Sequence, residues 1–514
     1  ISNVINNNFF SLKIYFKKIS NNEYEKNFSN IYFYDKKKVK GVLSGHEEKF
    51  FKNEDNFFIY HSFDWIKEAK NIGGPNLVTI ARNKILNWIE QNHKFNFYLT
   101  NHHLSSKRLL NLINHFDFYG SSANEEDKIK IKFIIFCHYT FLKKYLKINK
   151  NSSLELIGIK KSVLLFEATH NFNLKVIVEQ INKSLEDDTN SYGLHLSMSP
   201  QTQAEYINHL IEIKNIFLYF KIDSIKELEF KILNMTSVLK NFIHKDNSIA
   251  YFNGSNNFYS KEVFKILENE KDINIKNLND NKNCLVVYEN KNIKIIFDVV
   301  YPNNKLINYG FHSSTLSFEL SYINEKIITN CGSLNKTYKK IPDYFRYSAA
   351  HSSIILNNTN ISEIVENKSY KRIPRKINFE KKEDENELIW RASHDGYKIN
   401  YKNIIKREII ISKKSNQIKG SDEIIALGIK KTNNVYNIRF HLTPICKALL
   451  TRGKMSAIIK TNNSSFLFKS NNEISLEESI FVNNDNKIVK TTQIVISGFS
   501  SNQKKIIKWS ILKH

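Results

Sequence analysis

The segment Cys284–Val300, CLVVYENKNIKIIFDVV, is typical of two β-strands joined by a polar turn at ENKN. After it, short alternating segments such as KREIIISKKSNQIKGSDEI and TQIVISGF continue to the C-terminus, whereas from about residue 60 to 245 apolar residues recur at helical spacing. Helices followed by strands, without βαβ alternation, predict a helical domain and then an antiparallel sandwich-type domain. We place the boundary near residues 245–255, and expect domains at 1–250 and 251–514.

The helical part can be divided into individual helices. After Gly73-Gly74-Pro75, the spacing of Leu77, Ala81, Ile85 and Trp88 places these side chains on one helical face. Ser105 is the expected cap of the next helix. Further helices are expected at 126–147, 153–168, 171–186, 201–221 and 224–244.

Composition indicates a globular chain with an anionic partner. The length of 514 residues, 41% of them hydrophobic, suffices for two large domains or three small ones. The 76 Lys and Arg residues against 51 Asp and Glu give a net charge of +25, which favours nucleic acid, anionic lipid or acidic polysaccharide. The basic residues are spread along the chain and no nucleic-acid-binding module is recognisable, which argues against nucleic acid.

Cysteines and targeting signals are uninformative about the compartment. The four cysteines are far apart and form no CxxC pair, so neither a zinc-sulfur site nor a disulfide framework is predicted; they are Cys137, Cys284, Cys331 and Cys446. Lys13 interrupts the apolar N-terminal patch, and no small-residue cleavage site follows, so no signal peptide is expected. The missing initiator Met suggests a truncated start. No apolar run is long enough for a transmembrane helix.

Two histidines precede predicted strands. His312 lies in GFHSSTLSFEL, and His351 lies in RYSAAHSSIIL just before Ile354 and Ile355. Both strands must point their apolar faces into one core, so the two loops are expected at the same end of a sheet, with the imidazole nitrogens roughly 3 to 5 Å apart if both bind one metal ion.

Ten short segments, taken in order, resemble the heparinase II/III-like proteins of bacteria from about residue 60 to the end. They are WIKEAKNIGG, KILNWIEQ, YGLHLSMSPQTQ, AYFNG, FHSSTLSFEL, NCGS, RYSAAHSS, ASHDGY, RFHLTP and LEESIFV. The resemblance implies an N-terminal incomplete (α/α) toroid, a C-terminal antiparallel β-sandwich, and a lyase that cleaves uronic-acid-containing polysaccharides by β-elimination. It also implies a periplasmic or cell-envelope location, although the cytoplasm stays open.

The resemblance assigns candidate residues in the sheet domain. His312 corresponds to the second histidine of the family's HxHADxLSFEL-like segment, and Gly310 stands where the first would be. Where the family binds zinc, the corresponding positions here are His312, Asn330 and His351. Asparagine is a neutral and weaker ligand than the family's aspartate, so a structural zinc ion is the only cofactor the resemblance implies.

In the helical domain, YGLHLSMSPQTQ resembles the family's DGGHxExSPxYH segment. His195 is retained, but Thr202 replaces the tyrosine that transfers a proton in the family's lyases. Tyr206, one helical turn further on, is a candidate replacement. The predicted catalytic set is therefore His195, Tyr206, His312 and His351.

The segment SHDGY has two interpretations. Asp-Gly suits a turn that needs a positive φ, and this is the simpler one. Alternatively, His394 and Tyr397 contact the sugar chain. His441 is expected to be structural, and Glu477 and Glu478 to form a solvated or cross-strand charge pair.

Two functions remain open at this point. The first is a polysaccharide lyase with its cleft between toroid and sandwich; the second is a glycan-binding or envelope-assembly protein that keeps the fold without turnover. The retained histidines favour the first, whereas Gly310 and Thr202 favour the second. Hydrolysis is less favoured, because no pair of cleft carboxylates can be named.

Overall fold

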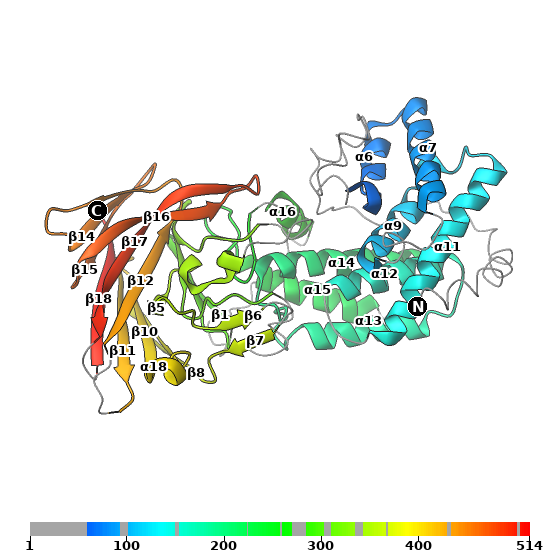
Figure 1. Cartoon of the computed structure of the whole chain (residues 1–514). Coiled ribbons are helices and arrows are strands. Elements are labelled where there is room, and N and C mark those ends of the chain that lie inside the picture. Colours follow the sequence, from blue (N-terminus) through cyan, green and yellow to red (C-terminus); the bar gives the residue numbers. More distant parts are fainter. Residues whose placement is uncertain are drawn as a thin grey trace. The chain divides into compact units, whose positions relative to one another are not determined.

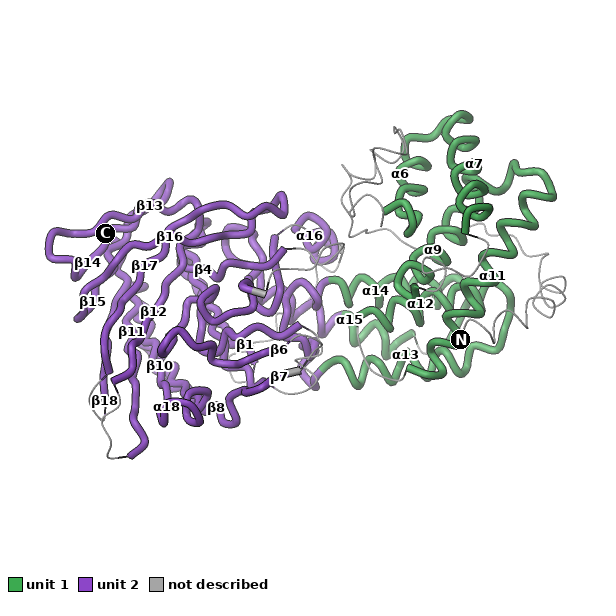
Figure 2. The backbone as a smooth tube through the Cα atoms, in the orientation of Figure 1, with its two compact units in different colours: residues 1–189, 205–232, 337–339 green, residues 190–204, 233–336, 340–514 purple. Residues whose placement is uncertain are grey.

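The computed structural model describes residues 59–92, 101–149, 154–223, 225–257, 260–269, 284–302, 310–334, 343–365, 369–428, 433–500 and 504–514. The chain divides into two compact units, which we describe one at a time (Figure 2). Unit 1 comprises residues 1–189, 205–232 and 337–339, and unit 2 comprises residues 190–204, 233–336 and 340–514. Across the ranges described, no helix is both long and apolar enough to cross a membrane.

Unit 1 is helical (Figure 1). Its helices are α6 (Trp65–Ile72), α7 (Pro75–Asn92), α9 (His102–Asn114), α10 (Phe116–Tyr119), α11 (Glu125–Ile148), α12 (Leu154–Thr169) and α13 (Lys175–Asp188). Two further helices, α14 (Pro200–Phe220) and α15 (Ile225–Lys240), contribute residues to both units. Helix α12 is buried on nearly all sides and packs against α9, α11 and α13, as expected for a central helix.

Asparagine caps begin two of these helices. The side chains of Asn101 and Asn124 accept hydrogen bonds from the backbone amides of Leu104 and Asp127, which satisfies donors that the first helical turn leaves open. Helix α9 therefore begins at His102, and the expectation that Ser105 caps it is wrong. Ser105 instead lies inside the helix and is buried.

The described residues of unit 2 form two eight-stranded antiparallel sheets and a two-stranded one. The first sheet has the order β1 (Leu285–Glu289), β2 (Ile293–Asp298), β3 (Phe318–Tyr322), β4 (Glu325–Thr329), β12 (Asn434–Leu442), β17 (Ile488–Ser500) and β16 (Ile474–Val482), with β5 (Ile354–Leu356) also paired to β12. The second has the order β13 (Lys447–Leu450), β14 (Ser456–Lys460), β15 (Ser465–Ser470), β18 (Lys504–Lys513), β11 (Ile418–Ala426), β10 (Asn403–Ser412), β9 (Glu387–His394) and β8 (Ile377–Glu383). The small sheet pairs β6 (Glu363–Val365) with β7 (Ser369–Arg372).

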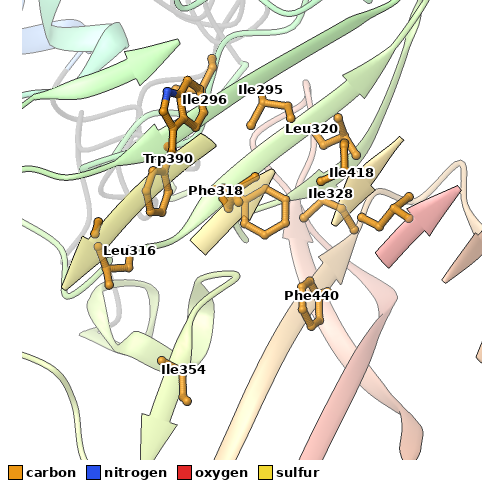
Figure 3. Close-up of a cluster of buried hydrophobic side chains, with 14 of the residues drawn as sticks. Ile295, Ile296, Leu316, Phe318, Leu320, Ile328, Ile354, Trp390, Ile418 and Phe440 are labelled. Carbon is orange, nitrogen blue, oxygen red and sulfur yellow. The ribbon is translucent and has the colours of Figure 1, made fainter. Parts of the chain in front are cut away.

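The two large sheets share one apolar core (Figure 3). Phe318 of β3 stacks on Trp509 of β18 with ring centroids 5.5 Å apart, and Phe297 of β2 stacks on Trp390 of β9 at 6.0 Å. Strands β9 and β10 alternate between buried and partly exposed residues, the pattern of a sheet with one face on a core and one toward water. This is a sandwich packed through side chains of both inner faces.

Strands β2, β3 and β4 are buried on both faces. Their second face is polar, and side chains there bond to the segment 241–257 that precedes the strands. Lys326 donates to the carbonyl of Ile249 at 3.3 Å, and His244 Nδ1 lies 3.0 Å from Ser321 Oγ. The segment 241–257 thus packs on the outer face of β3 and β4.

The predicted fold class, a helical region followed by antiparallel sheets, is confirmed. The hairpin predicted from Cys284–Val300 forms as β1 and β2, and the helix ranges predicted between residues 126 and 244 match α11 to α15 closely. In the part of the chain that the structure describes, two helices lie where a β-like pattern was expected and were missed: α16 (Ser260–Asn269) and the short α18 (Lys398–Tyr401).

Candidate functional site

The loop that carries His312 is fixed by hydrogen bonds from several segments. The amide of His312 donates to Asn253 Oδ1 at 3.1 Å, and Ser314 Oγ donates to Asp298 Oδ2 at 2.6 Å. The Ser313 and Ser348 hydroxyls are 2.7 Å apart. The small hydroxyl residues Ser313, Ser314 and Ser348 therefore pair with one another or with Asp298 where these segments pack closely.

The loop that carries His351 is held by a similar set. Ser352 donates from its amide to Asn330 Oδ1 at 3.0 Å and from its hydroxyl to the carbonyl of Thr329 at 2.7 Å. Ser353 Oγ donates to the carbonyl of Thr315 at 2.9 Å, which ties this loop to the loop that begins with His312.

His312 and His351 meet, as the sequence predicted. Their ring centroids are 5.5 Å apart, and the rings are inclined at 64°. His351 is 1% exposed, and neither of its ring nitrogens has a hydrogen-bond partner among the described residues. Burial lowers the pKa of His351 to about 3, against a small opposing effect of Glu319, so the imidazole is neutral at physiological pH.

Glu319 organises the polar face behind the histidines. Its carboxylate accepts a hydrogen bond from Lys326 Nζ at 2.7 Å and lies 2.9 Å from His244 Nε2. It also accepts hydrogen bonds from the backbone amides of Tyr251, at 3.1 Å, and Asn330, at 2.9 Å. Burial alone would raise the pKa of Glu319, but Lys326 and His244 outweigh it and hold the pKa below its usual range. The charged carboxylate thus fixes the backbone around Asn330.

His195 belongs to unit 2, as His312 does, and Asn253 links its segment to His312. Asn253 accepts from the His312 amide and donates from Nδ2 to the carbonyl of Met198 at 3.1 Å, three residues after His195. His195 Nδ1 lies 2.8 Å from Ser197 Oγ, and burial lowers the pKa of His195 to about 3. The segment expected to act from the helical domain is therefore part of unit 2.

Asn253 and Asn256 were not predicted as site residues. Asn256 Nδ2 donates to the carbonyl of Ser333 at 2.6 Å, and its amide donates to Gln201 Oε1 at 3.2 Å. For Asn253 the signal was present in AYFNG, one of the segments that carry the family resemblance, but a single asparagine in an Asn-rich sequence does not stand out; Asn256 lies outside that segment.

Tyr206 is not part of unit 2. It belongs to unit 1, is fully buried, and its hydroxyl donates to Asp188 Oδ2 at 3.0 Å. The proton-transfer role of Tyr206 stays a prediction.

His394 and Tyr397 are buried at the end of β9. The Tyr397 hydroxyl donates to the carbonyl of Thr359 at 2.8 Å, and His394 Nδ1 accepts the amide of Gly396 at 3.1 Å. Gly396 does not have the positive φ expected of it; instead a Cβ there would lie 2.9 Å from the carbonyl oxygen of Ile361. These contacts are those of a packed turn, and the sugar-binding role of the two side chains stays a prediction.

The residues proposed for zinc supply an incomplete donor set. His312 and His351 offer imidazole nitrogens, but the Asn330 amide is engaged on both sides, accepting from Ser352 and donating to the carbonyl of Tyr251 at 3.1 Å. No group of three or more His, Cys, Asp or Glu side chains in the described ranges is placed to hold a metal ion. Because structural zinc takes four ligands, these residues do not fit such a site, and no chemical step below depends on a metal.

Comparisons with known proteins agree with this architecture. Residues 284–510 match the family described as heparinase II/III-like, C-terminal. A crystal structure of heparinase III is similar with a TM-score of 0.70 and 13% identity, covering 98% of this chain and 89% of that one. The heparan sulfate lyase HepC from Pedobacter heparinus gives a TM-score of 0.64 and 12% identity, covering 98% of this chain and 88% of that one. At such identities the likeness shows the fold alone. No curated protein sequence matches the chain.

Proposed function

Because this chain is a heparinase II/III-like protein, with the family's C-terminal domain at residues 284–510, we propose that it is a polysaccharide lyase acting on uronic-acid-containing polysaccharides by β-elimination. From the solved relatives we carry over the heparinase-like fold and, for this proposal, the class of substrate. The activity rests on the side chains of this chain.

The reaction requires one proton acceptor and one proton donor. The acceptor takes the proton from C5 of the uronate, the electron pair of that bond forms the C4=C5 double bond, and the C4–O bond breaks. The leaving oxygen then takes up a proton, and no water is added. Neutral imidazole can accept a proton, and a nearby donor can protonate the leaving group.

The pairing of His312 with His351 is the observation that carries this proposal. The two rings, 5.5 Å apart, come from loops 39 positions apart in the sequence, since 351 − 312 = 39. We assign proton acceptance to His351, because its ring is neutral and its nitrogens make no hydrogen bond to described residues. A pKa near 3 makes this ring a weak base in the free protein, so the assignment requires that bound substrate stabilise the imidazolium and raise that pKa. We assign His312 and His195 to the same reaction, either in binding the substrate or in donating the proton that the leaving oxygen takes up.

An acidic polysaccharide fits the charge of the protein. The net charge of +25 attracts a polyanion over distances comparable with the Debye length. The structural relatives include heparan sulfate lyases, and from them we extend only the substrate class. A periplasmic or envelope location, where such polymers are encountered, is part of this proposal.

The test is a screen of purified protein against a panel of uronate polysaccharides, followed by ultraviolet absorbance of the C4=C5 product. We expect the parent protein to generate this chromophore on at least one polymer and His351→Ala to lose it. His170→Ala, at the end of α12 in unit 1, is the matched control and should keep the activity. A full panel without the chromophore would overturn the lyase assignment.

A second candidate, glycan binding without turnover, has its own supporting observation. His312 is 3% exposed and His351 is 1% exposed, and Thr202 and Gly310 replace residues that the family's enzymes use. In the same panel, binding of a polymer measured by calorimetry without the chromophore would favour this function.

A further inference from the structure

Arg407 is a charged residue inside the apolar core of the sandwich. It lies on the inner face of β10, is fully buried, and pairs across the strands with Asp422 of β11. Nε donates to Asp422 Oδ1 at 2.7 Å and Nη2 donates to Oδ2 at 3.0 Å, which is the two-pronged geometry that arginine makes with a carboxylate. Trp509 Nε1 also donates to Asp422 Oδ2, at 2.9 Å.

The remaining nitrogen of the guanidinium bonds to the loops that precede strands β3 and β5 of the other sheet. Nη1 donates to the carbonyl of Leu316 and to the carbonyl of Ser352, each at 2.8 Å. Leu316 lies in the loop that carries His312, and Ser352 directly follows His351. One planar group therefore bonds to the backbone of both histidine loops.

The backbone at Leu316 is in an unfavourable conformation. Its φ is +61°, in the left-handed region that leucine rarely adopts. The Leu316 amide donates to the carbonyl of Asp298 at 2.9 Å while its own carbonyl accepts from Arg407. The conformation persists because hydrogen bonds hold both sides of this residue, which is characteristic of strain near a functional site.

A buried ion pair is not needed to stabilise such a core, because apolar side chains of similar volume often serve equally well. We propose that Arg407 is a positioning residue that sets the spacing of His312 and His351 by holding the carbonyls of their two loops. The loss of turnover expected from this inference rests on the proposed lyase function. The expected change in the spacing of the two rings does not. Lysine cannot take the same place, because its single ammonium cannot bond to Asp422 in two-pronged fashion and to both carbonyls together.

Two variants test the proposal. Arg407→Lys keeps the charge opposite Asp422 but loses the bridge between the carbonyls. The double variant Arg407→Met/Asp422→Asn removes both charges, so that no unpaired ion is buried, and keeps an acceptor for Trp509. For both variants we expect kcat to fall by roughly 10- to 100-fold with KM changed less than about twofold, since the binding surface is unaltered while the reacting groups are displaced.

Two controls address a purely structural role. Arg391→Lys makes the same chemical change on the neighbouring strand β9, where Arg391 pairs with Glu408 on the outer face. Ile409→Val removes one methyl group from the same strand and core as Arg407. Both should keep kcat near the parent value when assayed where all proteins are folded. If Ile409→Val lowers kcat as much as Arg407→Lys, the positioning role is refuted.

Crystal structures of the Arg407 variants provide a measurement that does not depend on turnover. We expect the separation of the His312 and His351 rings, 5.5 Å in the parent, to change and the φ of Leu316 to relax toward negative values. Unchanged ring spacing in both variants would overturn the inference, whether or not the parent is a lyase. Changed spacing in a parent protein without the elimination product would overturn the proposed function and keep the inference.

Discussion

At the scale of single residues, burial determines the protonation of His351. Since it lowers the pKa to about 3, the ring stays neutral down to that pH. We expect the His351 signal in an NMR titration of ¹³C-histidine-labelled protein to stay constant from pH 8 to 5. The signal is assigned by its absence in His351→Gln. A midpoint near the ordinary value of 6.5 would show that water or a charged partner reaches the ring.

Asn253 offers a second test at this scale, because its side chain joins the His312 and His195 segments. It has a φ of +46°, which asparagine and glycine tolerate better than alanine. Asn253→Gly should lose the two side-chain hydrogen bonds, lowering the free energy of unfolding by about 1–3 kcal/mol and reducing kcat. Asn253→Ala should cost about 1–2 kcal/mol more, from backbone strain. Denaturant unfolding of the two variants separates these effects, and equal losses would contradict the strain argument.

The candidate site shows what single residues reveal from sequence. The approach of His312 and His351 was predictable, because both precede strands whose apolar faces must enter one core. Asn253 and Arg407 were not, because they act through backbone carbonyls and amides that are distant in sequence. Only nine of the 76 Lys and Arg residues are arginine, but an arginine in a strand does not by itself reveal which backbone carbonyls it will contact.

At the scale of elements, the polar face of β2 to β4 is the feature most sensitive to substitution. Lys326→Met would leave Glu319, which is fully buried, with much less compensation for its charge. We expect a loss of about 3–5 kcal/mol in the free energy of unfolding, measured by urea denaturation.

Lys294→Met is the matched control on β2. Lys294 is also buried, but its partner Glu289 is 45% exposed and can be solvated once the lysine is removed. Its loss should be clearly smaller. Similar losses for the two variants would mean that burial of the carboxylate does not determine the cost.

Elements with one apolar face were well predicted, and those shaped by tertiary contacts were not. Period-2 alternation located β10 and β11, and helical spacing located α11 to α15. The β-like texture expected after Asn257 hid α16. The cap of α9 was misplaced because both Asn101 and Ser105 are good caps in isolation.

At the scale of the whole molecule, buried neutral histidines make stability depend on pH. Burial lowers the pKa values of His195, His351, His394 and His441 from 6.5 to about 3. Between these values the unfolded chain binds more protons than the folded one, so the free energy of unfolding is fully present above pH 6.5 and falls as the pH drops toward 3. Each histidine contributes up to about 1.4 kcal/mol per pH unit.

Urea unfolding at a series of pH values measures this slope. Asp298 opposes this loss of stability in acid, because burial raises its pKa to about 6. Between pH 6 and 3.8 its protonation favours the folded state. The net effect should still be a clear acid destabilisation, and His394→Gln should reduce the slope by up to one proton. Stability that does not change between pH 7 and 4 would contradict the burial of these rings.

The segments of the chain that make up unit 2 limit how such proteins can evolve by recombination. Its residues come from 190–204, 233–336 and 340–514, so the chain passes between the units several times. A gene fragment starting at residue 251 would encode the strands but not His195 or His244, and Glu319 would lose one of its partners. Recombination at a single junction therefore cannot exchange the β-sandwich between relatives as an independent module. Its descent should follow that of the preceding helical sequence, and phylogenies built separately from the two parts should agree.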